Sequence, residues 1–327
     1  MMRATAMPKD ESVYSYSAVL MGSPILLKLF RHDEALAGRV FALIKRYEDL
    51  FTVNRAESEV MDINRAAGQR PVSVSAAVYQ LIKCAKAASV PPASAFNLAI
   101  GPLVKRWRIG FQGDSVPPEA DIQALLAITQ PQDVLLDDAR QSVFLAKPGM
   151  EIDLGAIAKG YIADRVRDLL RKEGVREGLI NLGGNVQTLG APEGGWSIGL
   201  QKPFAASGEL VGAIEVVDKS VVTSGTYERY FEQDGRRYHH ILNPHTGYPL
   251  DNELDSVTII STDSLDGDIW TTLLYGAGVE AGRQWLARRP DIEAIFVTKR
   301  REIFLSSRRH FRFTLLDDGY RLIDCTA

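Results

Sequence analysis

Hydrophobic and polar positions along the chain predict helices and strands interleaved from one end to the other. From Asp33 to Phe51, apolar residues recur at helical spacing, which predicts an amphipathic helix with one buried face. Alternating residues over 14–30, on both sides of Met21 and Gly22, predict two strands joined by a turn. Further elements are expected as follows: helices over 59–64, after Ser75, from Pro117, and over 268–275 and 279–288; strands over 209–217 and 254–261; hairpins over 134–147, around Gly235 and over 294–305.

The stretch 151–174 organises the rest of the chain. An apolar, β-compatible lead-in reaches a small-residue turn at Gly155 and Ala156, and a helical stripe through Ile162 and Val166 follows. This order predicts strand, tight turn and helix. Unpaired amides and the positive dipole end of such a helix favour a phosphate, and Lys159 adds a cation. Ordinary architecture with a solvated lysine explains the same residues.

A second short strand is predicted over 179–182, ending in Gly183 and Gly184. Without side chains at these two positions, a flat ring or a sugar can lie against the backbone. Together with the preceding helix start, this strand makes a nucleotide site the working hypothesis.

Length, composition and charge describe a globular protein with no global attraction to polyanions. The 327 residues are 46% hydrophobic and 24% charged, and Lys plus Arg number 38 against 41 Asp plus Glu. This balance excludes nucleic acid or an anionic membrane as a partner of the whole molecule, so phosphate recognition must be local. The candidate motifs are spread over the whole length, which predicts a single domain over 1–327.

Cysteine usage and the N-terminal residues predict a cytoplasmic protein. Cys84 falls in a helical pattern and Cys325 in the C-terminal tail, so a disulfide framework is not expected. The N-terminal residues contain neither the apolar run of a signal peptide nor a cysteine that could receive a lipid. No segment has the length of an apolar membrane span, so no membrane insertion is expected.

Three of the five histidines, His239, His240 and His245, fall within seven residues. In a strand, His239 and His240 point to opposite faces, so one of the two faces a given site. Histidine is the usual proton acceptor near neutral pH, which suits deprotonation of a hydroxyl nucleophile. Two surface histidines before a turn explain the same residues. A zinc site lacks a suitably spaced cysteine or carboxylate.

Asp268 and Thr272 are four residues apart in an expected helix and therefore share a face. A carboxylate with a hydroxyl suits magnesium carried with substrate phosphates, although Asp268 could instead cap the start of the helix. Phe96 beside Asn97 suits a ring that is both stacked and hydrogen-bonded, and a buried phenylalanine with a turn asparagine is equally consistent.

Seven motifs in this order resemble the FAD:protein FMN transferase family, also called ApbE-like. They cover some three quarters of the chain. The motifs are MGS (21–23), SAFNLAIGPL (94–103), DLGAIAKGY (153–161), LGGN (182–185), TSGTYE (223–228), HILNPHTGYP (240–249) and DIWTTLLYG (268–276).

The resemblance implies an α+β fold, a single compact unit related to tunnelling-fold proteins, and a magnesium-dependent enzyme that splits FAD. A Thr or Ser hydroxyl on a target protein would attack the phosphorus on the FMN side, AMP would leave, and FMN would remain attached through a phosphoester. The acceptor would be a flavin-dependent reductase. Two alternatives are kept: a pyrophosphatase that converts FAD to FMN and AMP, and a non-enzymatic FAD-binding protein.

The resemblance also assigns residues by motif. His240 would be the base, with His239 as the weaker candidate. The Ala156 carbonyl, Asp268, Thr272 and Thr271 would hold Mg²⁺. Contacts to FAD would come from Met21, Asn54, Ala95, Phe96, Asn97, Asp153, Lys159 and Leu242.

Three positions depart from the family's pattern. Asn97 and Asn243 stand where members commonly have Asp, which removes a charge and keeps hydrogen bonding. Asn54 stands where many members place a Tyr that stacks on the flavin. A flavin held less firmly at Asn54 would favour water as the acceptor.

Overall fold

The computed structural model describes residues 12–192 and 195–323. The N-terminal residues behind the cytoplasmic prediction, up to residue 11, and Cys325 lie outside this range. Cys84 is exposed and not in a disulfide. None of the helices in the described part is long and apolar enough to cross a bilayer.

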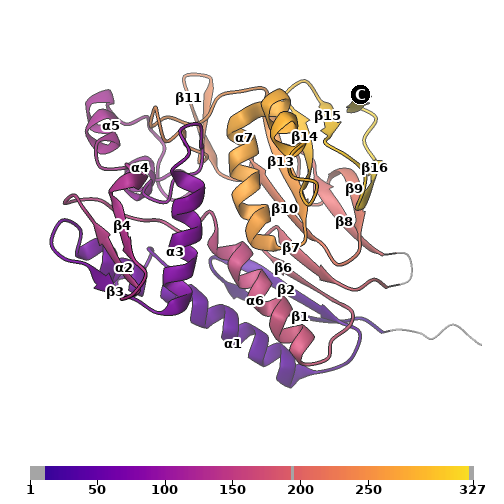
Figure 1. The fold of residues 1–327 in the computed structure, drawn as a ribbon. Coiled ribbons are helices and arrows are strands. Elements are labelled where there is room, and N and C mark those ends of the chain that lie inside the picture. The colour runs from indigo at the N-terminus through magenta and orange to yellow at the C-terminus, as the bar shows by residue number, and fades with distance from the viewer. Residues whose placement is uncertain (1–11, 193–194, 324–327) are drawn as a thin grey trace, which may run out of the picture.

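A mixed sheet of nine strands forms the centre of the α+β fold (Figure 1). Its neighbours pair antiparallel, apart from the last two, which are parallel. In spatial order the strands are β1 (Tyr14–Leu20), β2 (Ser23–Leu29), β6 (Gly178–Leu182), β7 (Asn185–Leu189), β10 (Ser220–Gly225), β13 (Leu254–Ser261), β14 (Glu293–Thr298), β15 (Glu302–Leu305) and β17 (Arg321–Ile323).

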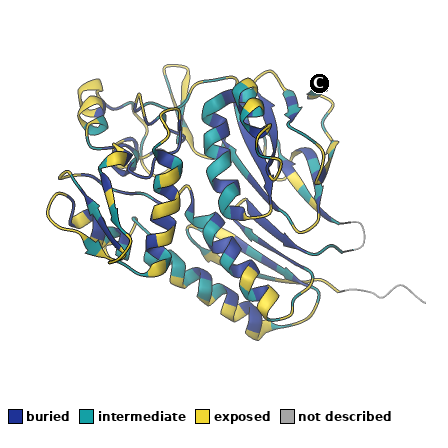
Figure 2. Ribbon diagram, viewed as in Figure 1, coloured by how far each residue is buried: buried dark blue, intermediate teal, exposed yellow. Residues whose placement is uncertain are grey.

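Three helices cover one face of this sheet: α1 (Glu34–Phe51), α6 (Ala158–Lys172) and α7 (Ser264–Leu286) (Figure 1). Each turns a buried stripe inward; the outward residues are exposed in α1 and α6 and mostly of intermediate burial in α7 (Figure 2). The predicted stripe of α1 is confirmed, since Leu36, Val40 and Ile44 are all fully buried. Asp33 caps that helix by accepting a hydrogen bond from the Leu36 amide at 2.9 Å.

The opposite face of the central sheet packs against a three-stranded sheet of β8 (Trp196–Gln201), β9 (Leu210–Val216) and β16 (Phe311–Leu315). Apolar side chains from both sheets, among them Val186, Ile260 and Ile214, share one core cluster. The sheet is therefore buried on both faces, and β13 and β14 are accordingly buried along almost their whole length.

The remaining elements gather at one side of the helical layer (Figure 1). Trp107 is buried at the centre of a small core there, and its indole N–H donates to the carbonyl of Gly247 at 2.8 Å. The elements are α2 (Glu59–Arg65), β3 (Val72–Ser73), α3 (Ala76–Ser89), α4 (Gly101–Trp107), α5 (Glu119–Leu126), the short 3-10 turn Pro131–Asp133, β4 (Val134–Asp137), β5 (Ser142–Leu145), and the hairpin β11 (Tyr230–Gln233) and β12 (Arg236–His239).

The expected strand before α6 is wrong. Residues 151–154 form no strand, although the Asp153 amide donates to the Leu98 carbonyl at 2.9 Å. Instead, the Asn64 side chain bridges the backbone of Ile152, donating to its carbonyl at 3.0 Å and accepting from its amide at 2.8 Å. An asparagine side chain therefore replaces the strand partner that the apolar pattern implied.

The two helices expected over 268–275 and 279–288 form one kinked element, and α7 begins earlier, at Ser264. Gly278 interrupts it with a φ of 77°, and the Glu253 carboxylate accepts from the Val279 amide at 2.8 Å, as an N-terminal cap would. Asp268 therefore lies inside the helix, and the alternative that it caps the helix start is wrong.

Candidate active site

Helices α6 and α7 approach each other very closely near the start of each. A Cβ atom added to Gly160 would lie 2.4 Å from the Ser264 carbonyl oxygen and 2.8 Å from an Asp268 carboxylate oxygen. Any side chain at position 160 would therefore push the helices apart. The small residues of the organising stretch serve this contact.

The Asp268 carboxylate lies between the two helices and is 7% exposed. One oxygen accepts a hydrogen bond from the backbone amide of Gly160, in the first turn of α6, and the other accepts from the side-chain amide of Asn185 at 2.9 Å. Burial raises the pKa of Asp268 to about 7, against the lowering effect of Gly160 and Lys159. The carboxylate thus occupies part of the positive end of α6, where the sequence predicted a phosphate.

A chain of buried hydrogen bonds leads to this carboxylate from the sheet. The Ser220 hydroxyl donates to the Ser264 hydroxyl at 2.9 Å, Ser264 donates to the side-chain oxygen of Asn185, and Asn185 donates to Asp268. Ser264 uses its only proton to bond the side-chain oxygen of Asn185, so the amide nitrogen of Asn185 must be the end that faces Asp268. The orientation of the Asn185 amide is therefore fixed.

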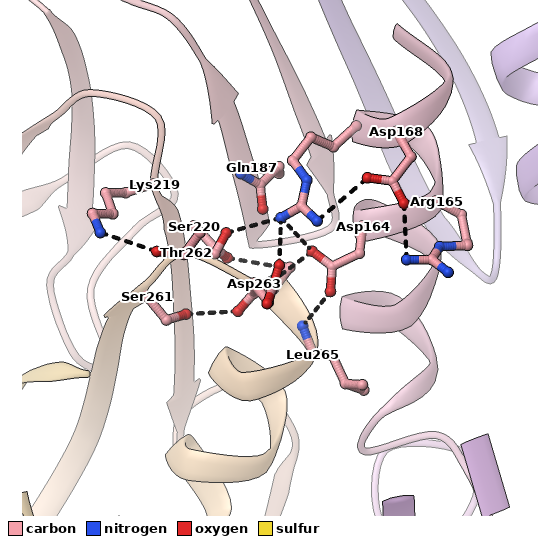
Figure 3. Close-up of polar contacts among 12 residues, drawn as sticks. Asp164, Arg165, Asp168, Gln187, Lys219, Ser220, Ser261, Thr262, Asp263 and Leu265 are labelled. Carbon is pink, nitrogen blue, oxygen red and sulfur yellow. Dashed lines mark hydrogen bonds and ion pairs between the residues drawn. The ribbon is translucent and has the colours of Figure 1, made fainter. Parts of the chain in front are cut away.

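An ionic cluster locks the start of α7 onto α6 (Figure 3). Asp164 accepts hydrogen bonds from the amides of Ser264 at 2.8 Å and Leu265 at 3.0 Å. Arg167, almost fully buried, pairs with Asp164 at 3.1 Å and with Asp263 at 2.8 Å. Asp164 therefore caps α7 from a neighbouring helix, and burial raises its pKa to about 6.

The backbone before α6 leaves an oxygen available. In a regular helix the Gly160 amide would donate to the carbonyl of Ala156, but here it donates to Asp268. Within the described residues no hydrogen bond reaches the carbonyl of Ala156, which lies in an exposed turn. Diversion of the Gly160 amide therefore frees the carbonyl that the sequence assigned to a metal.

The donors expected to hold a metal are all oxygens, as Mg²⁺ prefers. The Thr272 side chain is one turn after Asp268 and half-buried, while the Thr271 hydroxyl donates to the Asp268 carbonyl at 3.0 Å. Among the described residues no three His, Cys, Asp or Glu side chains cluster as metal ligands. The set here has a single carboxylate, which suits an ion that also takes oxygens from a phosphate substrate.

The three clustered histidines have different partners. His239 is buried, and its Nε2 donates to the Leu250 carbonyl at 2.7 Å. His245 is held through Nε2 by the Ser94 carbonyl at 3.1 Å. His240 donates from Nδ1 to the Arg229 carbonyl at 3.3 Å, which leaves Nε2 with a lone pair in the neutral ring.

Burial, followed by the positive charge of Arg229, lowers the pKa of His240 to about 4. The ring is therefore neutral near pH 7 and able to accept a proton at Nε2.

Lys159 connects the carboxylate and the imidazole electrostatically. Its charge acts on the pKa of Asp268, of His240 and of the Glu228 carboxyl, and its Nζ lies 3.4 Å from the Gly183 carbonyl oxygen. The charge of Lys159 therefore favours the ionised carboxylates of Asp268 and Glu228 and the neutral ring of His240. Lys159 belongs to the first turn of α6.

Two predicted FAD contacts line a cavity of about 370 Å³. Asn54 is exposed at its rim, and Asp153 lies at its wall with a carboxylate oxygen that accepts from the Gly155 amide at 2.7 Å. Burial raises the pKa of Asp153, and the positive charge of Arg229 partly offsets this rise. Through Arg229 the cavity adjoins His240.

Other predicted contacts have structural partners. Phe96 is buried in the main core, and the Asn97 amide donates to the Thr129 carbonyl at 2.8 Å and accepts from the Ala99 amide at 2.8 Å. Both line a second cavity of about 170 Å³, separate from the one that Asn54 and Asp153 share. Any FAD contact from Asn97 has to share these bonds or use its backbone.

The other three predicted FAD contacts lie in different parts of the fold. Met21 forms the β1–β2 turn with a φ of 53°, and its amide donates to the Glu48 carboxylate at 3.1 Å. Ala95 packs so closely on α7 that a Cβ at Gly276 would lie 2.2 Å from its own. Leu242 is buried in the core around Trp107.

Sequence reasoning missed two residues that shape this site. Asn185 ends the LGGN motif but received no role, because a pattern gives no hydrogen-bond partner 83 residues away. Arg229 directly follows TSGTYE, and only the fold places it beside both Asp153 and His240.

A model of the ApbE family matches residues 21–296 of the chain. The chain belongs to the ApbE family. A FAD:protein FMN transferase of Klebsiella pneumoniae (strain 342) is 71% identical over 97% of this chain and 99% of that protein. A second, of Treponema pallidum (strain Nichols), is 36% identical over 94% and 91%. Membership of the ApbE family makes the chain a transferase enzyme.

Solved ApbE structures share the fold. The apo form of the Pseudomonas stutzeri flavinyl transferase ApbE superposes with a TM-score of 0.77 and 30% identity, covering 93% of this chain and 94% of that one. The ApbE protein of Thermotoga maritima gives a TM-score of 0.77 and 32% identity over 88% and 95%. The expected α+β class and the resemblance to flavin transferases are thus confirmed.

Proposed function

We propose that this chain transfers FMN from FAD to a Thr or Ser hydroxyl of an acceptor flavoprotein in a Mg²⁺-dependent reaction that releases AMP. The acceptor is a flavin-dependent reductase. Support comes from the ApbE family match, from the names of the relatives, and from the chemistry of the side chains at the start of α6, in α7 and directly after β12.

One observation carries the proposal: the Asp268 carboxylate is buried against the first turn of α6, where it accepts a hydrogen bond from the Gly160 amide, next in sequence to Lys159. A cation, a buried carboxylate and a neutral imidazole are the groups that phosphoryl transfer to a hydroxyl uses. These three groups come from the start of α6, from α7 and from the residue after β12.

In the proposed step, one P–O bond forms and another breaks. The acceptor hydroxyl oxygen forms a bond to the FMN-side phosphorus, and the bond from that phosphorus to the bridging oxygen breaks, so that AMP leaves with the bridging oxygen. His240 takes the hydroxyl proton at Nε2, while its Nδ1–H remains on the Arg229 carbonyl. Lys159 offsets negative charge on the phosphates.

Asp268, Thr272 and the free carbonyl of Ala156, with Thr271 beside them, fit Mg²⁺ by the chemistry of their oxygens. Bound there, Mg²⁺ would supply charge neutralisation at the diphosphate. Gly160 and Asn185 orient Asp268 toward this role.

For FAD, the cavity at Asn54 and Asp153 has a volume typical of small-molecule sites. Lys159 and Met21 lie toward the diphosphate side in this proposal, and Ala95, Phe96, Asn97 and Leu242 contribute from the adjoining wall.

A second candidate is hydrolysis of FAD to FMN and AMP. Asn54 favours it, because this exposed amide at the cavity rim offers no aromatic face to a flavin ring. A flavin held loosely would leave room for water as the acceptor.

The test incubates the purified chain with FAD, Mg²⁺ and a candidate acceptor reductase, and follows AMP and the acceptor's mass. Transfer predicts AMP together with a covalent FMN adduct on a Thr or Ser. Release of AMP at the same rate without acceptor would indicate the pyrophosphatase. FAD that binds and stays intact would indicate a non-enzymatic FAD-binding protein.

His240→Ala should reduce transfer by about a hundredfold to ten-thousandfold, as expected for loss of a general base. His32→Ala is the matched control, since His32 lies at the far end of the β1–β2 hairpin from the Met21 turn, beside the exposed Tyr14. Full activity of His240→Ala would refute its assignment as the base.

A further inference from the structure

The loop that follows α4 presents an aromatic ring on a fixed backbone. The amides of Phe111 and Gly113 both donate to the Arg108 carbonyl at 3.0 Å, and the Arg108 side chain reaches Gln112 at 2.6 Å. A Cβ on Gly113 would lie 2.0 Å from the Trp107 carbonyl oxygen, so this turn requires glycine. Because Trp107 is anchored in its core, the loop is held at its base.

Phe111 is 62% exposed although it lines the 370 Å³ cavity. It is the sole aromatic residue among the described side chains that line this cavity, which include Val53, Asn54 and Asp153. A phenylalanine ring is usually buried, and one that is left open at the wall of a cavity offers an apolar face to a flat ligand.

Arg229 holds the outer side of this loop. Its guanidinium lies 5.6 Å from the centre of the Phe111 ring, and a Cβ on Gly110 would lie 2.6 Å from the Arg229 side chain. The Arg229 carbonyl also accepts the hydrogen bond from His240. The ring, the guanidinium and the proposed base are therefore fixed relative to one another.

We propose that Phe111 is the stacking partner of the flavin ring and thereby sets how firmly the FMN half of FAD is held. This inference rests on the proposed function, since it assigns the 370 Å³ cavity to the tricyclic ring. It assigns to Phe111 the aromatic contact that Asn54 does not offer. Held between Phe111 and the cavity wall, the ring keeps the FMN-side phosphorus beside His240.

The experiment measures binding of the two halves of FAD, FMN and AMP, without Mg²⁺ or acceptor, so that no turnover contributes to the signal. Titration calorimetry gives the dissociation constants of FMN and AMP separately for the parent, Phe111→Ala, Phe111→Tyr and Phe204→Ala. Phe204 is a matched control, because its ring also pairs with an arginine, Arg237 at 4.0 Å, but lies outside the cavity. Quenching of flavin fluorescence on binding provides a second readout.

Phe111→Ala should weaken FMN binding by roughly tenfold to a hundredfold, the effect typical of losing one aromatic stacking partner, and should reduce the quenching. Phe111→Tyr should restore both, AMP binding should stay unchanged, and Phe204→Ala should match the parent. Unchanged FMN binding in Phe111→Ala, or weaker binding of AMP instead, would overturn the inference. FMN binding that depends on Phe111 without any transfer would refute the proposed function alone.

Discussion

At the scale of single residues, hydrogen bonds fix which atoms of the buried amide of Asn185 and imidazole of His239 donate and which accept. Asn185 accepts from Ser264 and donates to Asp268, so its two ends cannot exchange without losing both bonds. Residues that orient a metal ligand in this way commonly contribute tenfold to a hundredfold to metal affinity.

Asn185→Leu should therefore weaken Mg²⁺ binding by about tenfold or more, because Asp268 loses its side-chain donor. Titration calorimetry with Mg²⁺, or with Mn²⁺ followed by electron paramagnetic resonance, measures the change without turnover. Gln187→Leu is the control. Gln187 lies on the same face of β7 as Asn185 and is fully buried, and its side-chain amide donates to the neighbouring Thr188 carbonyl and not to Asp268. Equal metal affinities in the two variants would contradict the role of Asn185.

His239 makes stability depend on pH. Its Nε2 donates to Leu250 and its Nδ1 accepts from the Ile241 amide at 3.3 Å, so the neutral ring is fully satisfied and an added proton would face that amide. Burial lowers the pKa of His239 to about 4. Between pH 6.5 and 4 the unfolded chain binds a proton there that the folded chain does not, so this contribution to stability is lost as the pH falls.

His239→Gln keeps a donor for Leu250 and removes the titration. As the pH drops from 7 to 4, the parent should lose up to about 3 kcal/mol of unfolding free energy relative to this variant. Urea unfolding at several pH values measures the difference. A difference that is constant with pH would show that His239 is not held neutral.

At the scale of elements, the crossing of α6 and α7 determines where Asp268 lies. Amphipathic stripes predicted α1 and α6 well, because burial of one helix face leaves a periodic trace: Ile162, Val166 and Leu170 are all buried. The closeness of the crossing left no such trace. Gly160 resembles any helix glycine in the sequence, and its neighbour Ser264 is 104 positions away.

Gly160→Ala should cost about 1–3 kcal/mol of stability, since the added methyl group collides with the Ser264 carbonyl. It should also weaken Mg²⁺ binding through displacement of Asp268. Gly38→Ala in α1 is the matched control, because no atom lies within 4 Å of the added Cβ and alanine favours a helix by roughly 0.5–1 kcal/mol. Thermal unfolding and Mg²⁺ titration of both variants measure the contrast, and equal stabilities would refute the close crossing.

The same limit explains the wrong strand before α6. Its apolar residues correctly indicated burial, but Asn64 supplies the backbone partner from 88 residues away. The motif residues, by contrast, were recognisable as a set because seven ordered segments resemble one family. Roles that depend on a motif were therefore accessible from sequence, while roles that depend on long-range contacts, such as that of Arg229, were not.

At the scale of the whole molecule, one core joins distant parts of the chain. The main hydrophobic cluster contains Ile25 of β2, Leu81 of α3, Val166 of α6 and Leu189 of β7. Strands from both ends of the described chain belong to the central sheet. The single domain over 1–327 stays a prediction.

A single domain should unfold in one cooperative transition. Variants that retain only Trp107 or only Trp196 report on separate cores, and their fluorescence midpoints in urea should coincide with each other and with the loss of far-UV circular dichroism. Two separated midpoints would indicate two domains.

The kink at Gly278 separates α7 into a part that carries Asp268 and a part that begins anew at Val279. Because the second part has its own cap, a change at one of its exposed positions need not be transmitted to the carboxylate. Leu286 fixes this segment to its core, whereas Glu280 and Gln284 are exposed and therefore offer places to attach a tether or a reporter while the reacting groups stay in register.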